Sequence, residues 1–314
     1  MLFIAPDHYS FYKVVEMGFI KYSGFEVVTI LSNGKYEYKN FFEKIKNFFY
    51  KNFLKKNLKI INFNNSTFNK IYKHSNFEVY FAIRPDILNE ETLKLAQNKS
   101  KKSIANYWDS FEKIKGQLET LPYFSKSYSF DNGDCIKYNL NKSTNFYFET
   151  EGFEIPEYDV FFLGTFDKRF NTLITILDIL NKNHNLNAKA QIFCYEPNDI
   201  KDFRNEYVTF IHEIVPFPDA IKFHQNTKII LDVQHNNQVG LSFRPFDCIG
   251  MKKKLITTNK NIVNYDFYNE NNIFIWTETT KSIPQEFLQT NYVDIPVEIY
   301  LKYSLENWVK TILS

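Results

Sequence analysis

The sequence predicts an α/β protein with two doubly wound domains. Its 314 residues are twice the length of about 150 residues that a single domain typically has. Short apolar runs alternate with stretches whose apolar residues recur at helical spacing, a pattern typical of parallel strands joined by helices. Hydrophobic residues make up 44% and charged residues 24% of the chain, so a disordered chain and a bundle of membrane helices are both excluded.

The first half of the chain contains one series of strands and helices. Apolar runs predict strands at residues 2–5, 25–31, 77–83, 103–108 and 128–130. Helical periodicity predicts helices at residues 12–22, 41–58 and 90–97. The periodicity is lost from 144 to 156, where Gly152 and Pro156 interrupt it. The two domains are therefore predicted to span residues 1–150 and 151–314.

The second half repeats this architecture. Strands are predicted at residues 160–163, 190–195, 208–211, 228–233, 254–258 and 273–276. Helices are predicted at residues 170–180, after a loop within 235–249, and in the tail at 296–313. Two Rossmann-like domains that face each other leave a cleft at the carboxyl ends of both sheets, where such folds bind ligands.

Charge and cysteine content restrict the partners and the compartment. Lys and Arg exceed Asp and Glu by 38 − 36 = 2, so a general nucleic-acid-binding surface is excluded. Cys135, Cys194 and Cys248 are widely spaced and odd in number, which favours a reducing compartment over a disulfide framework. The N-terminus lacks the basic region of a signal peptide, and no apolar run reaches the roughly 18 residues of a membrane-spanning helix. We expect a cytoplasmic protein, either in solution or resting on a membrane surface.

The segment 229–244 reads as a strand, a polar loop and the start of a helix. Gly240 and Ser242 stand where the helix is predicted to begin, and free amides at a helix N-terminus suit an anion. Arg244 adds a charged fork for the same phosphate. The strand 254–258 then delivers Asn259 to the same edge of the sheet.

Asp247 follows Arg244 by three residues and lies on nearly the same face of the predicted helix. A carboxylate there is suited to accept hydrogen bonds from ribose or sugar hydroxyls. The alternative is that Arg244 and Asp247 form an ion pair on the surface and that Gly240 is only a turn.

Several segments together resemble a known family. The main ones are residues 231–235, 238–244 and 250–260, and the others are 3–6, 107–110, 128–131, 162–165 and 303–308. In this order they resemble bacterial GT-B glycosyltransferases of capsule and lipopolysaccharide assembly, whose C-terminal domain carries a similar glutamine-glycine-leucine-threonine-x-arginine loop. The chain departs from that pattern at Asn236 and Asn237, where relatives have proline and glycine. Asp247 stands where relatives have glutamate, which keeps the acid with a shorter reach.

The resemblance implies a nucleotide-sugar donor bound by the C-terminal domain and an acceptor bound by the N-terminal domain. It implies sugar transfer to a growing capsular polysaccharide or lipopolysaccharide, with no cofactor and no obligatory metal. The donor-binding residues that it implies are Gly164, Thr165, Gln238, Gly240, Leu241, Ser242, Arg244, Asp247 and Asn259. Two other functions stay open: a non-catalytic binding module of the same fold, and a phosphotransferase that uses a CDP-linked polyol.

An inverting enzyme needs a base for the acceptor hydroxyl. Asp109 is the first candidate because it follows the strand 103–108, and its alternative role is to cap a helix that begins near Ser110. Asp7 and His8, after the first strand, are the next candidates. For the acceptor, Arg84 suits a phosphate or carboxylate, or else a structural salt bridge, and Trp108 suits a wall of the site.

The predicted helix 41–58 carries Lys44, Lys46, Lys51, Lys55 and Lys56 between its apolar residues. Such a helix suits contact with anionic lipid at the inner membrane and hence a lipid-linked acceptor. The alternative is a solvated lysine face over an apolar stripe that packs on the core.

Overall fold

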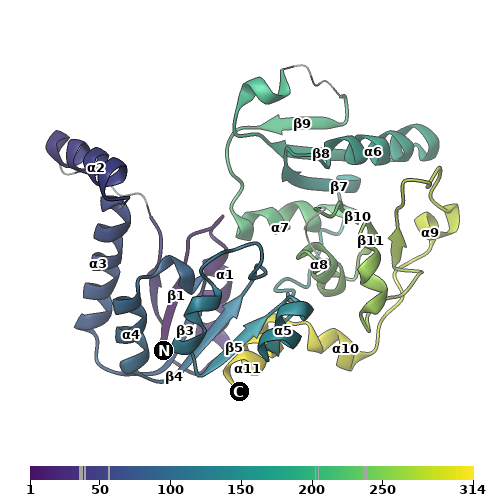
Figure 1. Ribbon diagram of the computed structural model, residues 1–314. Coiled ribbons are helices and arrows are strands. Elements are labelled where there is room, and N and C mark those ends of the chain that lie inside the picture. Colours follow the sequence, from purple (N-terminus) through teal and green to yellow (C-terminus); the bar gives the residue numbers. More distant parts are fainter. Residues whose placement is uncertain (35–37, 39, 56, 202, 204, 236–239) are drawn as a thin grey trace. The chain divides into compact units, whose positions relative to one another are not determined.

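The computed structural model describes residues 1–34, 38, 40–55, 57–201, 203, 205–235 and 240–314. It consists of two compact units, an N-terminal unit of Met1–Thr144 with Val309–Ser314, and a C-terminal unit of Asn145–Trp308 (Figure 1). The division falls a few residues before the predicted boundary at 150, and the end of the tail belongs to the N-terminal unit. Each unit is an open parallel sheet covered by helices, so the predicted α/β class is confirmed.

The sheet of the N-terminal unit has six parallel strands in the order β2-β1-β3-β4-β5-β6. The strands are β1 (Leu2–Ala5), β2 (Val28–Leu31), β3 (Phe77–Ile83), β4 (Ser100–Tyr107), β5 (Lys126–Ser129) and β6 (Asn141–Lys142). Both faces of the sheet are buried: Leu2 and Ile4 join one core, while the Phe3 ring lies 5.3 Å from Phe19 of helix α1 on the other. Burial on both faces explains why these strands read as continuous apolar runs.

Helices cover this sheet and extend beyond it. They are α1 (Phe11–Tyr22), α2 (Phe41–Phe53), α3 (Leu58–Lys73), α4 (Glu90–Asn98) and α5 (Asn132–Tyr138), with short 3₁₀ turns η1 (Pro85–Ile87) and η2 (Leu118–Tyr123). Nowhere in the described chain is a helix both long and apolar enough to cross a membrane.

The predicted helix 41–58 is wrong beyond Phe53, because a second helix, α3, follows it. Asn57 caps α3 with its side chain, which accepts the backbone N–H of Lys59 at 3.1 Å. Helix α3 was not predicted because part of its buried face is polar: Asn64 and Thr67 are buried. Asn64 Oδ1 accepts the N–H of Asn89 at 2.9 Å, so the helix docks through a hydrogen bond where an apolar stripe would be expected.

The sheet of the C-terminal unit also has six parallel strands, in the order β12-β11-β10-β7-β8-β9. The strands are β7 (Tyr158–Thr165), β8 (Ala188–Phe193), β9 (Val208–Ile211), β10 (Thr227–Asp232), β11 (Lys254–Thr257) and β12 (Ile273–Ile275). All six were predicted. Ile229 and Leu231 belong to one core cluster and Ile230 to another, so this sheet too is buried on both faces.

Helices follow these strands in alternation. They are α6 (Phe170–His184), α7 (Phe217–Gln225), α8 (Arg244–Met251), α9 (Gln285–Gln289), α10 (Val297–Lys302) and α11 (Leu305–Leu313), with 3₁₀ turns η3 (Pro197–Ile200) and η4 (Lys260–Asn264). The sequence did not predict α7, and the single predicted tail helix is divided into α10 and α11. Lys253 holds the end of α7, because its Nζ donates to the carbonyls of His224 at 2.8 Å, Gln225 at 2.6 Å and Thr227.

Each sheet has one point at which the order of its strands reverses. In the N-terminal unit this point lies between β1 and β3, and in the C-terminal unit between β7 and β10. Open doubly wound sheets bind ligands outside the carboxyl ends of the strands at such a point. The loops after these four strands are therefore where a site is expected in each unit.

Candidate functional site

Asp232 organises the carboxyl edge of the C-terminal sheet. It is the last residue of β10 and is 1% exposed. Its Oδ1 accepts the Ser242 hydroxyl at 2.9 Å and Nη1 of Arg244 at 3.3 Å, and its Oδ2 accepts the Thr257 hydroxyl at 2.9 Å. One carboxylate thus joins the ends of β10 and β11 to the start of α8.

Arg244, the first residue of α8, spans the point of reversal between β10 and β7. Besides its contact with Asp232, its Nη2 donates to the carbonyl of Leu163 in β7, and its guanidinium lies 4.7 Å from the centre of the Phe162 ring. Burial lowers the pKa of Arg244, and the Asp232 carboxylate opposes this shift. Nε of Arg244 is buried and has no hydrogen-bond partner among the described residues.

A second guanidinium, that of Arg169, lies at the same edge. Its Nε and Nη2 hold Asp167 at 2.9 and 2.7 Å, and its Nη1 donates to the carbonyl of Val233, just after β10, at 2.8 Å. The two guanidiniums contact consecutive residues, Val233 and Asp232, and the positive charge of Arg169 contributes to the lowered pKa of Arg244. Arg169 was not predicted as a site residue, and the one signal for it is that an arginine lies in the loop directly after β7.

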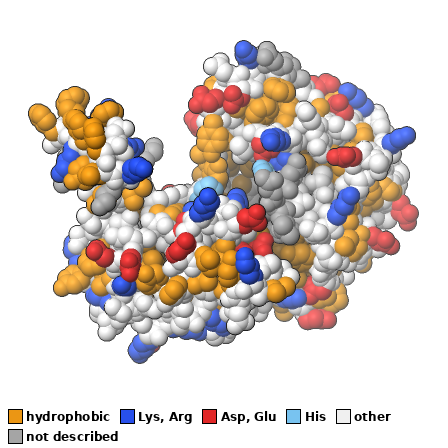
Figure 2. Space-filling view, viewed as in Figure 1, with side chains coloured by type: hydrophobic (Ala, Val, Ile, Leu, Met, Phe, Trp, Pro, Cys, Tyr) orange, Lys and Arg blue, Asp and Glu red, His pale blue; other side chains and the backbone are white. Residues whose placement is uncertain are grey.

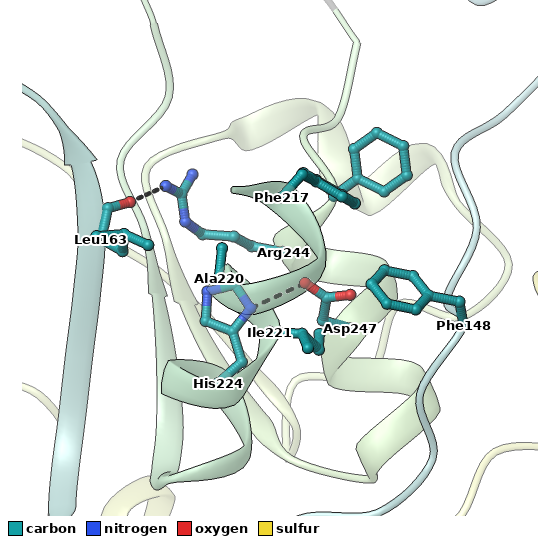
Figure 3. Close-up of a pocket in the computed structure, with 9 residues that line it drawn as sticks. Phe148, Leu163, Phe217, Ala220, Ile221, His224, Arg244 and Asp247 are labelled. Carbon is teal, nitrogen blue, oxygen red and sulfur yellow. Dashed lines mark hydrogen bonds and ion pairs between the residues drawn. The ribbon is translucent and has the colours of Figure 1, made fainter. Parts of the chain in front are cut away.

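A pocket of about 200 Å³ opens beside Arg244, between α7 and α8 (Figure 3). It is lined by Phe148, Leu163, Phe217, Ala220, Ile221, His224, Phe243, Arg244 and Asp247. The Phe217 ring lies 4.9 Å from Phe243 and 5.8 Å from Phe148, so aromatic rings form one wall. Apolar walls with a few converging polar groups are typical of small-molecule sites.

Asp247 and His224 supply polar atoms to this pocket. Asp247 Oδ2 lies 2.9 Å from Nδ1 of His224, and the two residues are 3% and 7% exposed. The other oxygen, Oδ1, is buried and has no hydrogen-bond partner among the described residues. It is turned toward Phe148 in Figure 3. Burial raises the pKa of the Asp247 carboxyl, and His224 acts in the opposite direction. The site therefore contains an acceptor oxygen that a ligand hydroxyl would satisfy.

A surface ion pair between Arg244 and Asp247 is excluded, because each is held by a different partner below the surface. The pairing of Asp247 with His224 was not predicted, because α7 has only a short apolar pattern and the two partners are 23 positions apart in the sequence. The buried face of α7 consists of the apolar Ile221 and the polar His224.

The N-terminus of helix α8 lies beyond the segment 240–242, whose amides were predicted to receive an anion. Helix α8 begins at Arg244, after Gly240 and Ser242, and its first N–H groups are already in use. The Arg244 N–H donates to the Ser242 hydroxyl at 3.3 Å, and those of Phe246 and Asp247 donate to the Phe243 carbonyl at 2.9 and 3.0 Å. The helix therefore begins later than predicted, and an anion-binding role for the amides of 240–242 stays a prediction.

The remaining predicted donor-binding residues shape this loop and its edge. Asn259, 1% exposed, donates through Nδ2 to the Gly240 carbonyl at 3.3 Å, and the buried Leu241 packs in the core. Gln238 lies outside the described residues.

Gly164 and Thr165 end β7 and lie at the predicted edge. A Cβ on Gly164 would come within 2.6 Å of the Phe162 ring. Glycine is required there because it leaves room for the ring on which the guanidinium of Arg244 lies.

A second group of predicted residues gathers in the N-terminal unit. Asp7 and His8 follow β1, Arg84 follows β3, and Asp109 follows β4. Burial lowers the pKa of His8, Asp109 and Asp7 raise it, and Arg84 and Lys113 lower it. These charges therefore surround the imidazole at the point where the strand order of this sheet reverses.

Each charged residue of this group also has a local partner. Asp109 Oδ1 accepts from Nζ of Lys113, and no helix begins near Ser110 in the described segment 109–117, so the capping role for Asp109 is wrong. Arg84 grips Asp86 through two hydrogen bonds of 2.8 Å, as the salt-bridge alternative proposed.

The loop after β1 has an uncommon backbone. Asp7 Oδ1 accepts the N–H of Ser10 at 3.0 Å, and Tyr9 and Ser10 have φ of 51° and 58°. Non-glycine residues seldom adopt positive φ, and such positions cluster at functional sites. Trp108 packs edge-on against Phe11 with the ring centres 4.2 Å apart and remains partly exposed, so it borders the same region.

No family model and no curated protein matches this chain. Solved structures are similar in fold. A UDP-N-acetylglucosamine 2-epimerase from Rickettsia bellii aligns with a TM-score of 0.50 and 12% identity, over 99% of this chain and 94% of that one. A glycosyltransferase from Rickettsia africae aligns with a TM-score of 0.50 and 10% identity, over 99% and 96%.

A chain of a glycosylation-associated protein complex from Streptococcus agalactiae is also similar, with a TM-score of 0.41 and 12% identity. The match covers 80% of this chain. It covers 53% of the streptococcal chain, so this chain spans about half the length of that protein. At such identities the likeness concerns the fold alone: the chain has the GT-B fold, with two Rossmann-like units.

Proposed function

We propose that this protein is a glycosyltransferase, which moves a sugar from a nucleotide-sugar donor to an acceptor hydroxyl. The observation that carries the proposal is the buried, unpartnered Oδ1 of Asp247 on the wall of an aromatic pocket next to Arg244. A ribose or sugar hydroxyl would supply the missing hydrogen bond. The similarity of the fold to a structure described as a glycosyltransferase supports the same proposal.

Three parts of a nucleotide-sugar donor have suitable partners at this pocket: the nucleobase, a hydroxyl and the diphosphate. The rings of Phe148, Phe217 and Phe243 offer flat apolar surface for a nucleobase. Asp247 offers its free oxygen to a hydroxyl. The guanidinium charges of Arg244 and Arg169 favour the diphosphate, whose negative charge grows as it leaves. Because side chains supply this charge, we propose that transfer does not require a metal ion.

His8 is our candidate for the base. Its pKa is lowered by burial, so the imidazole is neutral near pH 7 and able to accept a proton. Asp109 raises the pKa of His8 and so stabilises the imidazolium once the proton has moved. We therefore propose that Asp109, the first candidate from the sequence, acts as a charge partner of His8, and we assign Arg84 and Trp108 to the acceptor.

For an inverting transfer, the proposed step moves one proton, forms one bond and breaks one bond. The acceptor hydroxyl gives its proton to the base, and its oxygen forms a bond to the anomeric carbon. The bond from that carbon to the diphosphate breaks, and the nucleoside diphosphate leaves with the electron pair toward Arg244 and Arg169.

We further propose a cell-surface glycan as the acceptor, a capsular polysaccharide or a lipopolysaccharide, and a cytoplasmic location. The segments that resemble enzymes of capsule and lipopolysaccharide assembly support the acceptor. The three cysteines, all buried with free thiols, are compatible with a reducing compartment.

The test is a panel of nucleotide sugars incubated with the full chain, with release of free nucleotide measured with and without EDTA. We expect one donor to be hydrolysed slowly and saturably, at a rate that EDTA does not change. Rapid formation of a sugar epimer without release would indicate an epimerase, and a lack of turnover despite binding would indicate a binding module. Transfer of the polyol phosphate from a CDP-polyol would indicate a phosphotransferase.

A further inference from the structure

Helix α2 has an apolar face that is turned to solvent. Six of its apolar side chains are between 38% and 78% exposed, namely Phe41, Phe42, Ile45, Phe48, Phe49 and Phe53. The rings contact one another, since Phe49 stacks on Phe53 at 5.8 Å and lies 5.9 Å from Phe48. In Figure 2 these residues form part of the hydrophobic surface at α2, beyond the end of α3. Contiguous exposed apolar patches mark interaction surfaces.

Helix α2 turns its apolar side to solvent and its polar side to the protein, the reverse of an ordinary amphipathic helix. Within α2, all of which is described, the buried residue is Asn47. Its Nδ2 donates to the Tyr38 hydroxyl at 2.7 Å and its Oδ1 accepts the N–H of Leu58 at 2.8 Å. At about 100° per residue, the six apolar side chains occupy a sector roughly 140° wide, and Asn47 lies opposite its centre. The helix is thus anchored through its polar side, and the core-facing apolar stripe expected as an alternative is excluded.

Lysines border the apolar sector. Lys44 and Lys51 lie along one side and Lys46 along the other, and Lys55 is exposed just beyond the helix. Glu43 is the only acidic residue within α2. An apolar face flanked by lysines is the pattern of helices that lie in the surface of an anionic bilayer.

We propose that α2 docks this protein on anionic lipid membranes. The phenylalanine face enters the boundary between head groups and acyl chains, and the lysines contact the anionic head groups. A second copy of the chain fits the same face less well, because pairing two such helices would bring their lysine rows together. The proposal does not depend on the proposed sugar transfer.

The experiment is sedimentation of the full chain with vesicles of phosphatidylglycerol and phosphatidylcholine, compared with phosphatidylcholine alone. We expect the wild type to sediment with the anionic vesicles, and less so as salt is raised. The double variant Phe48→Ser/Phe49→Ser should lose at least about tenfold in partitioning, because two rings no longer leave water. Ile136→Ser, at an even more exposed apolar residue of the same unit, is the control and should bind like the wild type.

A variant Lys44→Gln/Lys51→Gln should bind anionic vesicles more weakly and with less dependence on salt. The side chains replaced in the phenylalanine, isoleucine and lysine variants are all exposed, so the thermal midpoint of unfolding of each variant should equal that of the wild type. Failure of the wild type to bind anionic vesicles, or equal binding by the phenylalanine variant, would overturn the proposal. So would a dimer in analytical ultracentrifugation that the phenylalanine variant loses while vesicle binding persists.

Discussion

At the scale of single residues, the candidate site depends on buried charges that hold one another. Asp232 receives three side-chain hydrogen bonds, and one of its donors, Arg244, also bridges to the carbonyl of Leu163. Removing either partner would leave a buried charge unpaired, which costs several kcal/mol in typical proteins, roughly 3–5. Arg244 therefore supports the fold in addition to its proposed role in ligand binding, and replacing it does not test ligand binding alone.

The charges around His8 predict how its titration responds to substitution. The pKa of His8 is lowered from the ordinary value of 6.5 by burial, so the acid limb of the activity profile should have its midpoint below that value. Asp109→Asn should move the imidazole pKa further down, because the carboxylate raises it, and Arg84→Gln should move it up, because the guanidinium lowers it. NMR titration of the imidazole measures both shifts.

A matched control for these shifts is Asp131→Asn, at a residue that does not contribute to the pKa of His8. A pKa of His8 that stays the same in Asp109→Asn would remove Asp109 as its charge partner. A wild-type pKa above pH 7 would remove the case for His8 as a base that is neutral at pH 7.

At the scale of elements, apolar pattern predicts strands well and predicts helices only where their buried faces are apolar. All six strands of the C-terminal sheet appear at their predicted places, because each is a short apolar run, although the edge strand β9 is only partly buried. Helices α3 and α7 escaped prediction because Asn64, Thr67 and His224 stand on their buried sides. Two of these polar residues connect elements by hydrogen bonds. His224 bonds to Asp247 in α8, and Asn64 accepts the N–H of Asn89, the residue just before α4.

Lys253 should stabilise α7, because its ammonium group caps three carbonyls at the end of that helix and the start of β10. Lys253→Met should lower the free energy of unfolding by about 2 kcal/mol, since buried carbonyls lose their donor. Lys252→Met is the control: Lys252 forms an exposed pair with Asp294, so its loss should leave the free energy of unfolding nearly unchanged. Urea denaturation measures both.

The same lysine predicts a dependence on pH. Burial lowers the pKa of Lys253 to about 8, below its value in the unfolded chain, so the unfolded state binds more protons between about 8 and 10.5. The stability of the wild type relative to Lys253→Met should therefore rise as pH increases through this window. A difference that stays constant would show that the lysine keeps its ordinary pKa, and a difference that falls would show that its pKa is raised.

At the scale of the whole molecule, the sequence predicted two α/β series but not the order of their strands. Strand order depends on pairing between segments far apart in the chain, such as β1 with β3 and β7 with β10, which local pattern does not record. That order places His8 beside Arg84 and Arg244 beside Leu163. The individual residues were therefore predictable from their position after strands, whereas the buried networks that join them were not.

The most direct test of the proposed function is calorimetric titration of nucleotide sugars into the wild type and Asp247→Asn. Because Asn keeps the shape of the side chain and removes the charge, the variant should fold normally and bind the preferred donor about tenfold or more weakly. Asp219→Asn, at an exposed carboxylate on α7, should bind it like the wild type. A wild type that binds none of the donors, or a variant that binds as tightly as the wild type, would contradict the assignment of this pocket to a nucleotide sugar.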